Sequence, residues 1–130
     1  MKVLLSIKPE FVEKIFSGEK QFEYRRSIFK NPNVDTIIVY STMPVGKIVG
    51  EFKIQQILNL NIEELWTETQ SKSGLNYSFY KSYFHDKDMG YAIKIDNVKE
   101  YKKPLSLSQV NKDLKAPQSF CYINDDLILA

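Results

Sequence analysis

Two short segments of this 130-residue chain carry the side chains that are best suited to chemistry. The first segment holds Ser6 and Lys8. The second, residues 20–26, holds one carboxylate among three cations: Lys20, Glu23, Arg25 and Arg26. Lysine and arginine donate charge-assisted hydrogen bonds to phosphate, and a carboxylate accepts from a base edge or a sugar hydroxyl. The two segments together are therefore a candidate site for a nucleotide or a nucleic acid.

The same residues have two other interpretations. They are also what a solvated strand with a cross-strand ion network contains, and such charge runs are common on protein surfaces. Alternatively, burial and a neighbouring Arg25 or Arg26 would lower the pKa of Lys20, with Glu23 shuttling a proton, which would make the pair hydrolytic. Spacing alone does not separate these three interpretations.

Two further groups of residues are candidates for ligand contacts. Tyr40 and Ser41 stand at the end of an apolar run, where Ser41 and backbone donors would meet an anion or a base, or would simply form a hydrogen-bonded turn. Residues 77–84 contain a set of aromatic side chains at helical spacing: Tyr77, Phe79, Tyr80, Tyr83 and Phe84. Such a set either stacks on single-stranded bases or packs against a sheet.

Composition narrows the range of functions. With 18 Lys and Arg against 16 Asp and Glu, the net charge of +2 is too small for binding nucleic acid by bulk electrostatics, so a local patch is required. A single cysteine, Cys121, excludes an intramolecular disulfide, and the few Cys and His residues predict no metal and no cofactor. No apolar run approaches the length of a signal peptide or membrane span, so we expect a cytoplasmic protein with no membrane contact.

Hydrophobic periodicity indicates the elements that position the candidate residues. The apolar residues 3–7 predict a strand, and Pro9 then begins an amphipathic helix that ends near Gly18. Residues 20–25 alternate as a second strand, with Phe22 and Tyr24 on one face. If these two strands pair, Lys8 and the cations of residues 20–26 converge at one place.

The remainder of the chain predicts a small α+β domain. Residues 36–40 read as a strand buried on both faces that pairs with a second strand over 47–58. Two capped helices follow Asn61 and Asn76, and a last main strand covers 90–95. We therefore expect one domain, 1–130, built as a small mixed β-barrel with a helix after the first strand and a helical pair inserted before the last main strand.

The motifs of this chain resemble those of one known family. They are Ser6–Pro9, Ile15–Arg26 with Gly18, Lys20, Glu23, Arg25 and Arg26, Val39–Pro44, Ile48–Phe52, Leu65–Trp66, Tyr91–Ile93 and Pro117–Phe120. In order and spacing they resemble the ASCH domain family, and most closely its bacterial, archaeal and phage members that are often labelled predicted transcriptional regulators. The resemblance implies a barrel similar to the RNA-binding PUA domain, with a groove between the barrel and its first helix.

The resemblance also implies two possible activities. Some ASCH proteins resemble amidohydrolases that act on acetylated cytidine through a lysine, a threonine and a glutamate, and others are ribonucleases. Lys20 matches that lysine, Glu23 stands where the threonine would be, and Glu64 and Glu68 are candidates for the glutamate.

These observations lead to one hypothesis with two alternatives. We expect a monomeric module that recognises single-stranded or modified RNA or a nucleotide, with Glu23 reading a base or ribose and the cations holding phosphate. The ligand-binding residues expected are Ser6, Lys8, Lys20, Glu23, Arg25, Arg26, Tyr40 and Ser41. The first alternative is a hydrolase of a modified nucleoside, or a ribonuclease, that uses Lys20 and Glu23; the second is a protein-interaction module.

Overall fold

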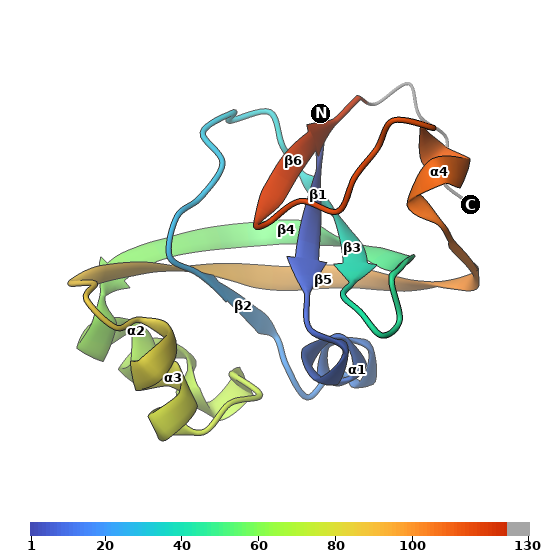
Figure 1. Cartoon of the computed structure of the whole chain (residues 1–130). Coiled ribbons are helices and arrows are strands. Elements are labelled where there is room, and N and C mark those ends of the chain that lie inside the picture. Colours follow the sequence, from blue (N-terminus) through green and yellow to red (C-terminus); the bar gives the residue numbers. More distant parts are fainter. Residues whose placement is uncertain (125–130) are drawn as a thin grey trace.

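The computed structural model describes residues 1–124, and its strands form one six-stranded sheet (Figure 1). The strands are β1 (Lys2–Ile7), β2 (Phe22–Arg25), β3 (Thr36–Ser41), β4 (Lys47–Asn61), β5 (Met89–Leu105) and β6 (Phe120–Ile123). The helices are α1 (Pro9–Ser17), α2 (Ile62–Thr69), α3 (Tyr77–Tyr83) and α4 (Leu107–Val110), with a 3-10 turn, η1 (Gln70–Lys72), after α2.

The sheet has the strand order β2-β5-β4-β3-β1-β6, and β1 with β3 is its parallel pair. The long strands β4 and β5 run antiparallel across the molecule, with α2 and α3 at one end and α4 at the other (Figure 1). Pairing of β3 with β4 confirms the expected neighbours, and the register shifts between Val39, which faces Gly50, and Tyr40.

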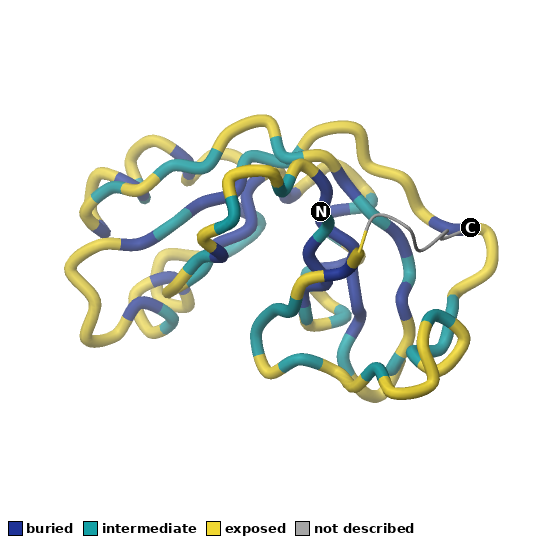
Figure 2. Tube along the Cα trace, turned by 90° about the horizontal axis from the view of Figure 1, so that it is seen from above, coloured by how far each residue is buried: buried dark blue, intermediate teal, exposed yellow. Residues whose placement is uncertain are grey.

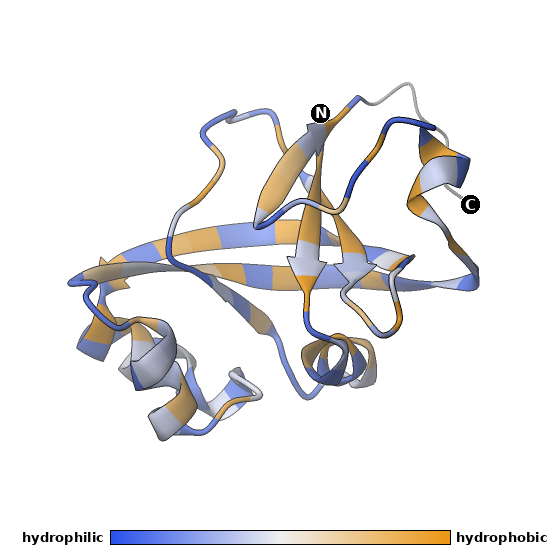
Figure 3. Ribbon diagram, in the orientation of Figure 1, coloured by the Kyte–Doolittle hydropathy of each residue, from blue (hydrophilic) through white to orange (hydrophobic). Residues whose placement is uncertain are grey.

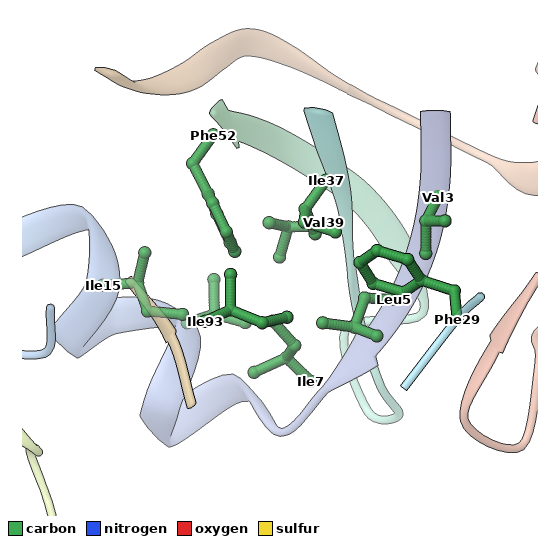
Figure 4. Packing of buried hydrophobic residues seen from close by; sticks show 10 residues of the cluster. Val3, Leu5, Ile7, Ile15, Phe29, Ile37, Val39, Phe52 and Ile93 are labelled. Atoms are coloured by element: carbon green, nitrogen blue, oxygen red, sulfur yellow. The ribbon is translucent and has the colours of Figure 1, made fainter. Parts of the chain in front are cut away.

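Apolar residues of β1 and β3 supply the centre of the core. All six residues of β3 are buried, which confirms a strand covered on both faces. The hydrophobic residues of β1 and β3 are consecutive, whereas hydrophobic and polar residues alternate along much of β4 and β5 (Figure 3). Side chains from four strands and α1 point toward one another around Phe52 and Ile93 (Figure 4). Exposed segments run mostly around the outside of the molecule (Figure 2).

Local sequence signals place the helices as expected. Pro9 occupies the first turn of α1, and Gly18 ends it with φ +85°, a conformation that glycine adopts without strain. The Asn61 side chain accepts from the backbone N–H of Glu64 and caps α2, and Asn76 caps α3 in the same way. α2 and α3 then cover a second core that includes Leu65.

The structure differs from the sequence expectation in three elements. β5 extends to Leu105, well beyond the predicted residues 90–95, because it pairs along most of β4. The short helix α4 and the strand β6 were not predicted. Four residues carry too little periodicity to identify β6, which exists because the edge of β1 offers it backbone partners.

The mixed α+β class is confirmed, but the closed barrel is not. Among residues 1–124, β2 pairs only with β5 and β6 pairs only with β1, so these two strands form the edges of an open sheet. The expected pairing of β1 with β2 was therefore wrong, because three other strands lie between them in the sheet order. No helix in this part of the chain combines the length and the apolar character needed to span a bilayer.

Candidate functional site

A cavity of about 610 Å³ lies where the end of β1, the start of α1, β2 and α3 meet. Its wall includes six of the residues expected from the sequence: Ser6, Lys8, Lys20, Glu23, Arg25 and Arg26. The two segments converge although their strands are not neighbours, because the sheet curves and brings β2 back toward β1. A hydrogen bond from the Arg25 side chain to Ser6 O marks this approach directly.

Lys20 lies in the wall of the cavity, with 2% of its surface exposed. Its ammonium donates to the carbonyl oxygen of Ser73 at 2.7 Å and lies 4.8 Å from the centre of the Tyr24 ring. Burial lowers the pKa of Lys20 to about 8, an effect that Glu23 opposes and Lys14 reinforces. Burial thus lowers the pKa of Lys20 as expected, but the neighbouring cation that contributes is Lys14 rather than Arg25 or Arg26.

Glu23 and Arg25 form the one ion pair of the cavity among the described residues. The Glu23 Oε2 atom accepts from Arg25 Nη1 at 3.2 Å, and the two side chains are only 8% and 12% exposed. Arg25 also donates from Nη2 to the hydroxyl of Ser119 at 2.7 Å and reaches Ser6 O and Ser119 O at 3.4 Å. Both terminal nitrogens are therefore engaged by protein, so Arg25 is better placed to orient Glu23 than to bind phosphate.

The two exposed cations of the cavity differ in their partners. Arg26 donates from Nη1 to the carbonyls of Tyr83 and His85, at 2.8 and 2.6 Å, and so holds the C-terminal end of α3. Lys8 lies 5.7 Å from the centre of the Phe79 ring and has no ion-pair partner among residues 1–124. The charge of Lys8 is therefore available to an anionic ligand.

The aromatic side chains at α3 have two roles. Tyr80 and Phe84 are buried against the sheet, as helical aromatics commonly are. Phe79 and Tyr83 line the cavity, where Phe79 packs edge-on against Phe11 at 5.2 Å between ring centres. Tyr83 donates its hydroxyl to the carbonyl of Tyr24 at 3.0 Å.

Tyr40 and Ser41 were expected to bind ligand, but the structure places both outside the cavity. Tyr40 is buried in a third apolar cluster with Leu4 and Tyr101. Ser41 is 2% exposed and lies in the sheet between β1 and β4. They are buried because β3 is a central strand to its last residue, and the first residue to reach the cavity is Thr42.

Several residues of the cavity wall were not predicted from the sequence. Gln118 and Ser119 precede β6 and reach the wall because Ser6 binds this segment, through its hydroxyl to Pro117 O and its N–H to Ser119 O. The motif Pro117–Phe120 was a signal for them. Glu64 and Glu68, the candidate hydrolase glutamates, are exposed on α2 and do not line the cavity. Within the described residues, no group of three His, Cys, Asp or Glu side chains is arranged to hold a metal.

Comparison with known proteins identifies relatives over nearly the whole chain. An ASCH domain-containing ribonuclease of Zymomonas mobilis is 26% identical over 129 residues, which cover 96% of this chain and 86% of that protein. ATP synthase subunit alpha of Ureaplasma parvum is 30% identical over 122 residues, 93% of this chain. This chain spans only 15% of the length of that subunit, so the likeness concerns a small part of it.

The crystal structure of ASCH from Zymomonas mobilis has the same fold. It superposes with a TM-score of 0.88 at 25% sequence identity, and the match covers 95% of this chain and 88% of that one. The model of the ASCH domain family matches residues 5–99, which run from the second half of β1 through β4 and the helical pair into β5. The chain therefore belongs to the ASCH domain family.

Proposed function

We propose that this protein binds single-stranded RNA and holds one nucleotide in the cavity beside Lys20. The observation that carries the proposal is that one cavity wall combines aromatic rings with cations that form no ion pair with a described residue. Lys8 and Arg26 lie exposed at the cavity, Lys20 lies buried, and Phe79 and Tyr83 line it. Single-strand binding sites combine positive charge for the backbone with rings on which bases stack.

Three further observations support this proposal. The cavity volume of about 610 Å³ lies within the range of small-ligand sites, roughly 300–1,000 Å³. Four cations face one carboxylate, so the wall is basic although the whole chain carries only +2. The Zymomonas relative carries the name ribonuclease, which makes RNA the favoured ligand class for this chain.

A binding titration with a matched control tests the proposal. A short fluorescent single-stranded RNA is titrated with the parent protein, Lys8→Ala and Lys103→Ala, because Lys103 is exposed on β5 and outside the cavity. Lys8→Ala should weaken binding and reduce the slope of log affinity against log salt by about 0.7. Lys103→Ala should match the parent in both. Equal affinities and slopes for all three proteins would reject the cavity as the RNA site.

A second candidate function is hydrolysis at the same site, as in the ribonuclease or amidohydrolase alternative. It is favoured by the pKa of Lys20, because a lysine with a pKa of about 8 is partly neutral near physiological pH and can act as a base or nucleophile. Glu23 would be its acid–base partner in this interpretation. Labelled single-stranded RNA and acetylated cytidine, each incubated with protein and a chelator, test it. Product no greater than with Lys20→Met would leave binding as the function.

A further inference from the structure

The Glu23 carboxylate presents an unused acceptor to the cavity. Oε2 accepts from Arg25, but Oε1 receives no hydrogen bond from any described residue, although only 8% of the side chain is exposed. Among the described residues, no fully buried side-chain oxygen lacks a hydrogen-bond partner, so Oε1 is an oxygen that remains accessible from the cavity. An accessible carboxylate oxygen in a cavity wall is available to a donor group of a bound ligand.

The donor cannot come from a phosphate group, which is negatively charged and offers acceptors to this site. Glu23 therefore faces the base or sugar of a bound nucleotide, while the exposed Lys8 is suited to the phosphate. Lys20 donates one of its three N–H groups to Ser73 O, so two remain for a ligand acceptor beside the carboxylate. The wall thus presents an acceptor pair and a donor within one cavity.

Resting on the RNA binding proposed above, we propose that Glu23 makes the cavity selective for guanine. The two carboxylate oxygens accept from guanine N1–H and the N2 amino group, and Lys20 donates to O6. Guanine is the RNA base that presents two adjacent N–H donors on its pairing edge. Adenine and cytosine place a ring-nitrogen acceptor beside a single amino group, and uracil flanks its one N–H with carbonyl oxygens, so each of these bases turns an acceptor toward the carboxylate.

Arg25 explains why the carboxylate discriminates between bases. Its bonds to Glu23, Ser6 and Ser119 fix the carboxylate between β2 and the segment before β6, so the acceptors cannot turn to suit another base. The Glu23 Oε2 atom retains accepting capacity beside Arg25, since a carboxylate has about four lone-pair positions. The charge and orientation of Glu23 are thus set before the ligand binds.

The test uses oligouridylate strands with one central position varied. The strand with guanosine should bind the parent protein on the order of tenfold tighter than strands with adenosine, cytidine or uridine. Inosine keeps N1–H and O6 but lacks the amino group, so it should lose most of that preference. Glu23→Gln offers a single acceptor oxygen and should bind the guanosine and inosine strands equally. Glu13→Gln, an exposed residue of α1 with the same charge change, should keep the preference.

Each other outcome contradicts a defined part of the inference. Equal affinity of the parent for all four strands overturns guanine selection, while the Lys8→Ala result still decides RNA binding. Weakening of all strands alike by one central 2′-deoxynucleotide assigns Glu23 to the sugar and overturns the inference. Absence of binding to every strand rejects the proposed function itself. If Glu23→Gln does not fold, the guanosine–inosine comparison on the parent decides the question.

Discussion

The guanidinium of Arg25 and the hydroxyl of Ser119 lie 2.7 Å apart, nitrogen to oxygen, and join the two edges of the open sheet. Arg25 ends β2, the strand at one edge, and Ser119 directly precedes β6, the strand at the other. The same guanidinium also binds Glu23 in the cavity. One arginine thus connects the edges by side-chain bonds where a closed barrel would have backbone bonds, and it orients the cavity's carboxylate.

Replacing Arg25 by lysine should destabilise the fold, because an ammonium cannot reproduce a planar fork that binds several acceptors. We expect a loss of about 1–3 kcal/mol in the free energy of unfolding, measured by denaturant titration. In a double-mutant cycle, Arg25→Lys with Ser119→Ala should show a coupling energy of at least about 0.5 kcal/mol. The same cycle with the exposed Ser108 should be additive; additivity with Ser119 would contradict the edge connection.

The lowered pKa of Lys20 predicts that the protein becomes more stable as the pH rises above about 8. This folded pKa of about 8 lies below the ordinary 10.5, so between these values the unfolded chain binds more protons and the free energy of unfolding rises with pH. The free energy of unfolding of the parent, minus that of Lys20→Met, should therefore increase from pH 8 to 9.5, by at most about 1.4 kcal/mol per pH unit. Denaturant titrations across that range measure it. A difference independent of pH would show that Lys20 has an ordinary pKa.

Position 74 requires a glycine for two reasons: its backbone conformation and the closeness of the Lys20 side chain. Its φ is +69°, and a Cβ there would lie 2.8 Å from Lys20 Cβ, whereas Gly18 has φ +85° with open space around it. Gly18→Ala should cost about 1–2 kcal/mol of stability from backbone strain alone. Gly74→Ala should cost more than Gly18→Ala in thermal or denaturant unfolding, and should weaken RNA binding by displacing Lys20. Equal stability losses would show that the Lys20 side chain moves away from the new methyl group without a cost in stability.

Phe79 should contribute to RNA binding by stacking. It lines the cavity, whereas Tyr77 on the same helix is similarly exposed but does not. Phe79→Ala should cost about 1–3 kcal/mol of binding free energy in a fluorescence titration, the usual value of one base–aromatic contact. Tyr77→Ala should bind like the parent. A loss of equal size in both variants would indicate damage to α3 rather than loss of stacking.

Elements that depend on local chemistry are predictable from the sequence alone. Helix α1 begins at Pro9 and ends before Gly18, and Asn61 and Asn76 cap the two inserted helices. A run of β-branched residues makes β3 a buried strand. These signals act within a few residues, so they can be recognised without the rest of the fold. The motif of residues 20–26 likewise marked part of the cavity wall, because its charged side chains stand within a few positions of one another in the sequence.

Which of these candidate residues face the cavity, and what each one does there, depends on the tertiary fold. Tyr40 is buried in the core because β3 is central, and Arg25 is occupied by Ser119, which lies 94 residues further along the chain. Lys20 has a lowered pKa because the folded chain buries its side chain. Burial and long-range hydrogen bonds depend on how the sheet curves and which edges meet, and no local pattern specifies these.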